Sequence, residues 1–403
     1  MSSQNTRLED EKRMTQIDLS LHDIPSKDLE RSEAVYERVL HALGGCSGGV
    51  LPFDTFMDLV LYSEHGYYTA ENKIFGPTGD FVTAPESGEL FGRCLGSQCF
   101  EILQSIPGDI IEYGAGTGRL AVTILREYLK KHAVLDFNYI IVEPSRSLRA
   151  RQKKLIAEEM PEQLDRITWL TDHPRDEVKG VVIANEVFDA MPSKRFVVSK
   201  TGIKEMGVSL QSGQLDWAIM DCAVPEKVRA LLGKHSLGYC ADLIQGMESW
   251  FGSIKDYFKQ GVLIVSDYGY GGPEFFHHQR VDGTLQCHFR HQVHDNPFQL
   301  FGLQDLTASV NFTELAECAE GVGICVEGFT SQAHFLIGSK IQEMIGETSG
   351  EDLAETYKLA QEAKRLLLPT HMGENFKFMA LCRNIDPSMK MSGFMHDERY
   401  RLG

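Results

Sequence analysis

Glycine and acidic residues spaced as in a nucleotide-binding site lie in the first half of the chain. The apolar run Asp109–Tyr113 leads into Gly114-Ala-Gly-Thr-Gly118, and helix-like sequence follows. Between a strand and a helix, glycine permits a tight turn and lets backbone approach a ligand closely. The glycines Gly114, Gly116 and Gly118 stand at offsets 0, 2 and 4, whereas a dinucleotide fingerprint has offsets 0, 2 and 5, and no Gly-Lys-Ser/Thr follows. The pattern therefore argues against a dinucleotide and against a P-loop.

Three acids follow the neighbouring predicted strands. Glu112, two residues before the loop, places negative charge near the ligand, which suits the amino group and sulfonium of S-adenosylmethionine. Glu143 ends the next strand, 143 − 118 = 25 residues on, near the distance at which a carboxylate holds both ribose hydroxyls. Asp172, beyond the third strand, is expected to reach the adenine amine. The alternative is a glycine turn that serves strand–helix packing only, with solvated acids at the strand ends.

A second cluster, residues 185–192 with the sequence Asn-Glu-Val-Phe-Asp-Ala-Met-Pro, comes directly after the fourth predicted strand. Glu186 and Asp189 are three residues apart, so both carboxylates share a face if the segment is the first turn of a helix. Two acids there can hold a guanidinium or ammonium group by charge-assisted hydrogen bonds. The alternative is helix capping, with Asn185 at the N-cap.

The elements that must position these residues alternate between strand and helix. Buried strands are predicted at 109–113, 139–142, 167–170, 181–184 and 262–265, with helices between them, which indicates a parallel sheet covered on both faces. After Pro192 the hydrophobic period becomes two, over 195–200, 204–210 and 214–218, which predicts an antiparallel insertion. Helices are predicted at 29–43, 52–61 and 87–105, a closing strand pair at 323–330 and 333–337, and a helical, then polar, C-terminal end.

Composition narrows the class of protein. The chain has 403 residues and a net charge of −17, so its main task is not to coat a phosphate backbone, and its length suggests two or three structural units. No apolar run approaches a membrane span, and the polar first residues do not resemble a signal peptide. Nine cysteines without paired metal spacing indicate reduced thiols in a cytoplasm. A metal site would be conceivable among the histidines at positions 277, 278, 288, 291 and 294. Neither a Cys pair nor an HExxH motif accompanies them, so we expect no bound metal ion.

The chain resembles the MidA-type, class I S-adenosylmethionine-dependent methyltransferases, the family of the mitochondrial complex I assembly-factor protein arginine methyltransferase. The resemblance runs from about residue 54 to 383. It is carried by GYYT (66–69), GDFVTAPESGELFG (79–92), IIEYGAGTGRLA (110–121), IVEPSRSLRARQ (141–152), ANEVFDAMPSKRF (184–196), SDYGY (266–270), GTLQCHFRHQVHDNP (283–297), DLTASVNFTELA (305–316) and LLLPTHMGENFKFMAL (366–381).

The resemblance implies an α/β, Rossmann-like class I methyltransferase fold with a mostly parallel seven-stranded sheet. We expect a disordered N-terminus (1–25), a helical extension with a cofactor-covering loop (26–107), the methyltransferase core (108–340) with its insertion at about 195–260, and a C-terminal helical segment (341–403). The glycines of the loop and Glu143 are implied to cradle S-adenosylmethionine. Gly79, Asp80, Thr83 and Pro85 are implied to lie over it.

The resemblance implies that the methyl acceptor binds beside Asn185, Glu186, Asp189 and the loop that carries His291. We also assign Asn185 to the cofactor-binding site. We expect arginine ω-N-methylation in which Glu186 and Asp189 orient the guanidinium and His291 accepts a proton, or else makes a structural hydrogen bond. The expected protein partner is a subunit of respiratory NADH dehydrogenase. The alternatives are methyl transfer to a small molecule or RNA, and a non-catalytic assembly factor that retains the fold.

Overall fold

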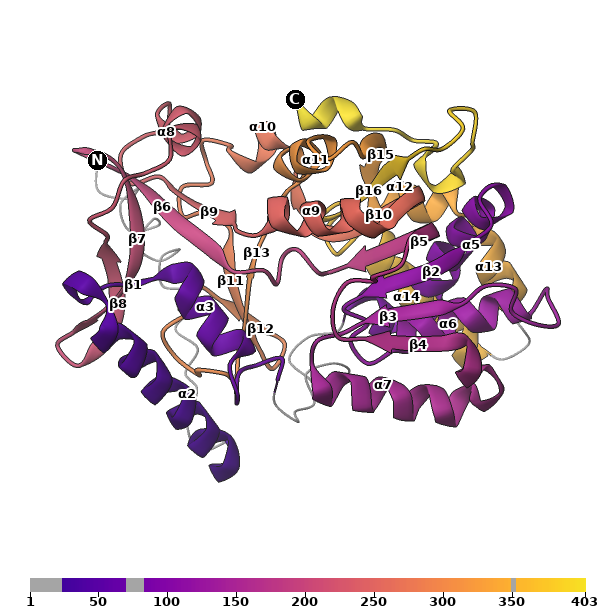
Figure 1. Cartoon of the computed structure of the whole chain (residues 1–403), viewed down its shortest axis with the longest axis horizontal. Coiled ribbons are helices and arrows are strands. Elements are labelled where there is room, and N and C mark those ends of the chain that lie inside the picture. Colours follow the sequence, from indigo (N-terminus) through magenta and orange to yellow (C-terminus); the bar gives the residue numbers. More distant parts are fainter. Residues whose placement is uncertain (1–23, 70–82, 349–352) are drawn as a thin grey trace. The chain divides into compact units, whose positions relative to one another are not determined.

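The computed structural model (Figure 1) describes residues 24–69, 83–348 and 353–403. They form two compact units. Unit 1 contains described residues 24–69 with Pro192–Asp242 and Asp282–Ala308, and unit 2 contains 83–191, Leu243–Val281 and Ser309–Gly403 apart from 349–352. The N-terminal segment predicted to be disordered lies outside the described residues, except for its last two positions. No helix in the described part of the chain is both long and apolar enough to cross a bilayer.

The sheet of unit 2 confirms the predicted α/β fold. Its order is β15-β16-β10-β5-β2-β3-β4, with the short strand β14 beside β10. The bounds are β2 Asp109–Tyr113, β3 Tyr139–Val142, β4 Ile167–Leu170, β5 Val178–Asn185, β10 Phe258–Tyr270, β14 Val310–Asn311, β15 Cys325–Ser331 and β16 Phe376–Arg383. The strands from β10 to β4 are parallel, and β16 is antiparallel to both of its neighbours. The chain runs outward from β2 through β3 and β4, then returns to β5 on the other side, so a topological switch point lies between β2 and β5.

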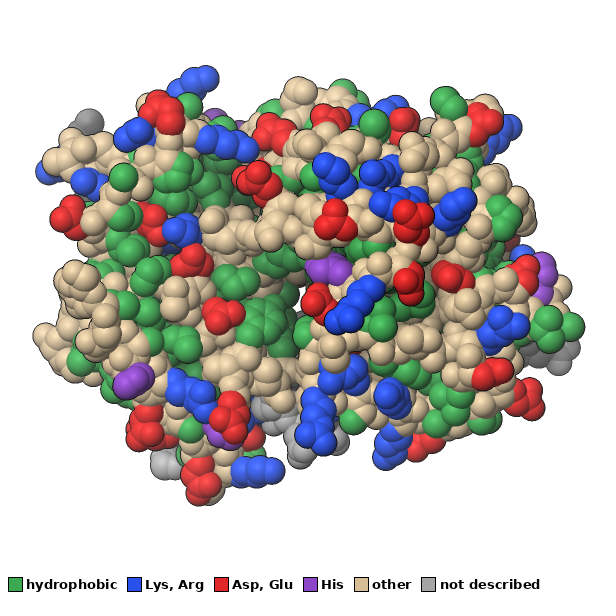
Figure 2. All heavy atoms as spheres, viewed as in Figure 1, with side chains coloured by type: hydrophobic (Ala, Val, Ile, Leu, Met, Phe, Trp, Pro, Cys, Tyr) green, Lys and Arg blue, Asp and Glu red, His purple; other side chains and the backbone are tan. Residues whose placement is uncertain are grey.

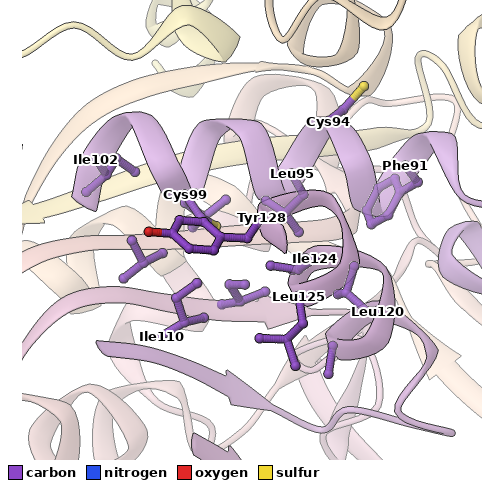
Figure 3. Close-up of a cluster of buried hydrophobic side chains, with 14 of the residues drawn as sticks. Phe91, Cys94, Leu95, Cys99, Ile102, Ile110, Leu120, Ile124, Leu125 and Tyr128 are labelled. Carbon is purple, nitrogen blue, oxygen red and sulfur yellow. The ribbon is translucent and has the colours of Figure 1, made fainter. Parts of the chain in front are cut away.

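Helices cover this sheet: α5 Leu90–Ser105, α6 Arg119–Leu129, α7 Arg146–Glu159, α9 Met247–Tyr257, α11 Phe312–Glu320, α12 Gln332–Gly338, α13 Ile341–Thr348 and α14 Leu353–Leu367. Figure 3 shows the packing of α5 on α6, where Leu95 and Cys99 meet Ile124, with Ile110 of β2 nearby. All four side chains are fully buried and belong to one core cluster. The pair anchors the helix that begins at the glycine loop.

Two predictions near the C-terminus are wrong. The expected strand at 333–337 is helix α12, and its Ser331 hydroxyl accepts a hydrogen bond from His334 N–H as an N-cap. The strand that closes the sheet is β16, in a region predicted to be helical. β16 is buried on both faces, and its residues Phe378–Cys382 form a short continuous apolar run, which cannot be told from a helix by period alone.

Unit 1 contains the predicted antiparallel insertion. The helices α2 Ser26–Gly45 and α3 Phe53–Tyr62 precede a sheet of order β1-β7-β6-β9, in which β8 also pairs with β7. Its strands are β1 Leu51–Pro52, β6 Ser193–Ser199, β7 Gly202–Gln211, β8 Gln214–Ile219 and β9 Cys240–Ile244. A second sheet has the order β12-β11-β13, with β11 Leu285–Phe289, β12 Gln292–His294 and β13 Asp305–Ala308. The insertion expected over 195–260 belongs to this unit only as far as Asp242, since α9 lies in unit 2.

The surface charge is mixed in sign on the face that Figure 2 shows. Asp and Glu side chains are interspersed there with Lys and Arg side chains. The basic side chains therefore do not form a continuous field on this face, as binding along a phosphate backbone would require.

Candidate functional site

The carboxyl ends of five strands in unit 2 lie in one row. In the strand register, Leu170 of β4 pairs with Val142, Val142 with Tyr113, Tyr113 with Ala184, and Ala184 with Val265 of β10. The next residue on β3, β2, β5 and β10 is therefore Glu143, Gly114, Asn185 and Ser266 respectively. Ligands of open α/β sheets bind at such ends, at the switch point. The register thus brings together residues that are up to about 150 positions apart in the sequence (266 − 114 = 152).

The loop Gly114–Gly118 has the backbone conformation that requires glycine. Gly114, Gly116 and Gly118 have φ angles of 62°, 51° and 90°. This left-handed region is costly for residues with a Cβ. Gly118 is the N-cap of α6, and a Cβ there would lie 3.4 Å from Gln152. The loop is therefore held with its backbone exposed toward the strand ends, as close approach to a ligand requires.

Gln152 of α7 connects this loop to the ribose-binding acid that we predicted. Its fully buried amide donates to the carbonyl oxygen of Gly116 (3.0 Å) and to Glu143 Oε2 (3.3 Å), and it accepts from Trp169 Nε1 (3.2 Å). Glu143 Oε1 accepts from the Ser145 N–H at 2.9 Å. Burial raises the pKa of Glu143 to about 7 in spite of these donors. Sequence reasoning assigned no role to Gln152, although it ends the IVEPSRSLRARQ motif.

Glu112 lies beneath the loop. Its carboxylate is 2% exposed, and its Oε2 accepts from the Tyr139 hydroxyl at 2.8 Å. Burial raises its pKa to about 7; the Tyr139 hydrogen bond opposes that shift, and the charge of Glu143 adds to it. The Glu112 carboxyl group is therefore enclosed in the interior beside Tyr139, and its attraction of a cationic ligand stays a prediction.

The predicted adenine side lies at the end of β4. Asp172 is exposed, and its Oδ1 accepts from the His173 N–H at 2.8 Å. The Tyr113 hydroxyl lies 2.7 Å from His173 Nδ1 and 2.6 Å from the Tyr257 hydroxyl. Trp250 of α9 packs edge-on against Tyr113. Asp172 is therefore exposed, whereas the Tyr113 and Tyr257 rings near it are buried, and its contact with the adenine amine stays a prediction.

Two buried polar atoms at the strand ends have no hydrogen-bond partner within the described residues. They are Asn185 Oδ1 on β5 and Ser266 Oγ on β10, and the two residues are direct register partners. Buried polar groups are nearly always hydrogen-bonded, so a pair of unsatisfied atoms at one place indicates a missing partner. A polar ligand at the row of strand ends would supply that partner.

The segment after β5 is not a helix, so the helical prediction for 185–189 and the capping alternative are wrong. Asn185 is the last residue of β5, and a turn follows in which Met191 N–H donates to Phe188 O. Glu186 has a φ of +52°, an uncommon conformation for a residue with a Cβ. What holds the turn is a long-range contact, because Asp267 Oδ2 accepts from the backbone N–H of Phe188 (2.9 Å) and of Asp189 (3.3 Å).

Asp267 is therefore a site residue that sequence reasoning missed. It is fully buried, and its Oδ1 accepts from the Tyr268 N–H at 2.8 Å. Burial and then the neighbouring charges of Asp189 and Glu186 raise its pKa well above the ordinary value. Burial also raises the pKa of Asp189 to about 7. The signal was present in the SDYGY motif, where an acid directly follows a buried strand.

The remaining predicted residues are placed as follows. Thr83 is buried and is the N-cap residue of the short helix α4 (Ala84–Ser87), which contains Pro85. The Thr117 hydroxyl of the glycine loop donates to the Glu86 carboxylate, so α4 contacts the glycine loop. Gly79 and Asp80 lie outside the described residues. His291 is exposed in the two-residue turn between β11 and β12, with a φ of 64°, and it belongs to unit 1 rather than unit 2.

The fold and these strand ends define a class of protein. Residues 94–330 match the family described as "Putative S-adenosyl-L-methionine-dependent methyltransferase". The chain belongs to this family, as the resemblance noted in the sequence predicted.

Particular relatives agree with that assignment. A solved structure of a Burkholderia thailandensis protein bound to S-adenosyl-homocysteine is 34% identical, with a TM-score of 0.87 over 93% of this chain and 98% of that one. The mouse "Protein arginine methyltransferase NDUFAF7, mitochondrial" is 27% identical over 86% of this chain and 88% of its own length. The human protein of the same name is 26% identical over 88% of this chain and 84% of its own length.

S-adenosylmethionine is accordingly the cofactor, as predicted. The residues at the strand ends fit it: three glycines in the left-handed region, a buried acid at the end of β3, and the unsatisfied oxygens of Asn185 and Ser266. That Glu143 holds the ribose and that the glycine loop contacts the amino-acid part of the cofactor stay predictions.

Proposed function

We propose that this S-adenosylmethionine-dependent methyltransferase modifies an arginine side chain of a protein, on an ω-nitrogen of the guanidine. The observation that carries the proposal is the group of three acids beside the cofactor position, Glu186, Asp189 and Asp267. Burial and then the charges of Asp189 and Glu186 raise the pKa of Asp267, so the grouped acids favour a ligand that carries positive charge. A guanidinium supplies that charge and offers five N–H donors to carboxylates. The names of the mouse and human relatives support the same acceptor.

Each acid has a separate role in this proposal. Glu186, held at the turn by the hydrogen bond from its N–H to Ser266 O (2.8 Å), accepts from the guanidinium and fixes its orientation. Asp189 is the second acceptor, and it loses its proton as the guanidinium arrives, because an opposite charge lowers a carboxyl pKa. Asp267 does not touch the substrate; it positions the turn through the two backbone N–H groups. When bound, the cofactor supplies the electrophilic methyl group.

His291 stays a predicted proton acceptor. The guanidinium must lose one proton during or after transfer, since it has no free lone pair while protonated. His291 is exposed, and an imidazole can act as a general base in such a step. His291→Gln is expected to slow transfer and to change its pH profile, whereas a merely structural role would leave that profile unchanged.

The test is methyl transfer by the full chain. Purified protein is incubated with methyl-labelled S-adenosylmethionine and a lysate, and labelled peptides are sequenced by mass spectrometry. Label on arginine is expected, and Glu186→Gln should abolish it while cofactor affinity, measured by calorimetry, stays nearly unchanged. Glu162→Gln, at an exposed position outside the site, is the matched control.

Other outcomes decide between the alternatives. Label on a small molecule or on RNA would replace the arginine proposal with another acceptor. Cofactor binding without any transfer would indicate a non-catalytic assembly factor. Full turnover of the Glu186→Gln variant would remove this residue from the mechanism.

We also propose a subunit of respiratory NADH dehydrogenase as the target and the cytoplasm as the compartment. The target follows from the family resemblance. The compartment is supported by the nine cysteines, all of which are free thiols in the structure, as a reducing environment would maintain them. Arginine-containing peptides of that enzyme, compared by mass spectrometry between cells with and without this chain, are expected to differ by a methyl group. Identical peptides would refute the target.

A further inference from the structure

A second group of ligating side chains lies in unit 2 and shares no residue with the strand ends. His334 is on α12, while His396 and Glu398 lie between the short 3-10 helices Ser392–Phe394 and Arg399–Leu402. His334 Nδ1 is 2.9 Å and His396 Nε2 is 3.3 Å from the same oxygen, Glu398 Oε1. One ligand atom from each of the three residues lies within 4.8 Å of the other two.

Such a convergence of ligand atoms is satisfied either by N–H···O hydrogen bonds from the imidazoles or by a metal ion. A neutral imidazole nitrogen and a carboxylate oxygen both carry lone pairs, so they repel each other unless a proton or a metal ion lies between them. In a tetrahedral zinc site with metal–ligand bonds of about 2.0–2.1 Å, the ligand atoms are about 3.3 Å apart. The two nitrogen–oxygen separations are close to that value. Two histidines and one glutamate are also a ligand set that zinc uses.

The carboxylate is held in place by its surroundings. Glu398 is 5% exposed as a side chain, and its other oxygen, Oε2, accepts from Arg401 Nη1 at 2.7 Å, which leaves Oε1 directed at the two imidazoles. The Glu398 N–H donates to Phe329 O of β15 at 2.6 Å. Ligating carboxylates are usually oriented by such outer hydrogen bonds. The Ser331 hydroxyl lies 2.9 Å from His334 Nδ1, the same nitrogen that faces Glu398 Oε1, so a metal ion bound at this nitrogen would replace that hydrogen bond.

We propose that His334, His396 and Glu398 bind a Zn²⁺ ion, with a fourth position left for water. The ion joins the last residues of the chain to β15 and α12, and it therefore stabilises the C-terminal segment. This site differs from the histidines of 277–294, which the sequence singled out and for which we expected no metal. No motif could reveal it, because His334 and His396 are 62 positions apart (396 − 334). Nitrogen ligands favour zinc over magnesium or calcium.

Zinc titration of the full chain, without a polyhistidine tag and after chelator treatment, tests this proposal. One equivalent of Zn²⁺ is expected to bind by calorimetry and to raise the melting temperature, and Mg²⁺ is expected to do neither. Co²⁺ in place of zinc is expected to give the visible absorption of a tetrahedral nitrogen–oxygen site. His396→Ala should abolish the single binding step, and its side chain is 59% exposed, so folding, checked by circular dichroism, is expected to persist.

The matched control replaces two other neighbouring histidines, His277 and His278, with alanine. This double variant is expected to bind zinc as the wild type does. Absence of a one-equivalent step in the wild type would overturn the proposal. So would an equal step in His396→Ala and in Glu398→Gln, since the three groups would then be only a hydrogen-bonded cluster.

Discussion

Glu112→Gln is the substitution whose effect the structure predicts most directly. The glutamine keeps an oxygen that can accept the Tyr139 hydroxyl and removes only the charge. In the native state the pKa of Glu112 is raised from the ordinary 4.5 to about 7, chiefly by burial. A raised native pKa means that the protonated form is favoured by folding, so its contribution is complete below pH 4.5 and is lost as pH rises through about 7.

The magnitude follows from this pKa difference. The rise from 4.5 to about 7, at about 1.36 kcal/mol for each pKa unit, gives about 3 kcal/mol in full. Between pH 5 and pH 8 the linkage relation gives about 2–3 kcal/mol of that total. The side chain is 2% exposed, so solvent screening takes little from this value. Wild-type protein without cofactor is therefore expected to lose this stability between the two pH values relative to Glu112→Gln.

Urea unfolding at pH 5 and pH 8, followed by tryptophan fluorescence, measures the effect. The free energy of unfolding of the variant is expected to rise by about 2–3 kcal/mol relative to the wild type between pH 5 and pH 8. Glu162→Gln, at an exposed position, should follow the wild type at both pH values. Parallel pH dependence of the wild type and Glu112→Gln would show that the buried carboxyl bears no penalty, and the account of Glu112 would be refuted.

Further predictions concern the turn, the loop and the thiols. Asp267→Asn is expected to slow methyl transfer by about 100-fold through misplacement of the acidic turn, with cofactor affinity by calorimetry nearly unchanged; unchanged turnover would refute its positioning role. Gly118→Val should lower the free energy of unfolding by about 1–3 kcal/mol and weaken cofactor binding, because φ is +90° and Gln152 lies 3.4 Å from the added Cβ. Urea unfolding would measure the loss of stability, and cofactor titration would measure the loss of affinity. Burial raises the pKa of the Cys99 thiol, so Cys99 should resist a thiol reagent in the native protein, whereas the exposed Cys325 should react. Equal labelling of the two cysteines, measured by mass spectrometry, would contradict this prediction.

Local patterns in the sequence predicted most of the sheet. The strands at 109–113, 139–142 and 167–170 have the predicted bounds, since each is a short apolar run between turn or helix signals. The glycine loop and Glu143 could also be found, because a strand, three close glycines and an acid after the next strand are all defined by sequence distance. The family resemblance supported the same cofactor and added the expectation of a seven-stranded class I sheet, although the closing strand β16 was not predicted.

The acidic turn after β5 could not be predicted correctly. The sequence Asn185–Asp189 has good helix-capping residues, and a local interpretation favours a helix there. The structure instead gives a turn, because the buried Asp267 from a strand 78 residues away accepts from the Asp189 N–H and also from the Phe188 N–H. A contact over that distance leaves no signal in the local pattern.

Local sequence patterns were enough to predict most strands and helices and the chemistry of the residues at their ends. Folding in three dimensions establishes which of those residues meet: Gln152 with Gly116 and Glu143, Asp267 with the turn, and His334 with Glu398. The physical reason is that hydrophobic period and glycine placement act over a few neighbouring residues, whereas burial, strand register and the pairing of buried polar groups depend on segments that are distant along the chain.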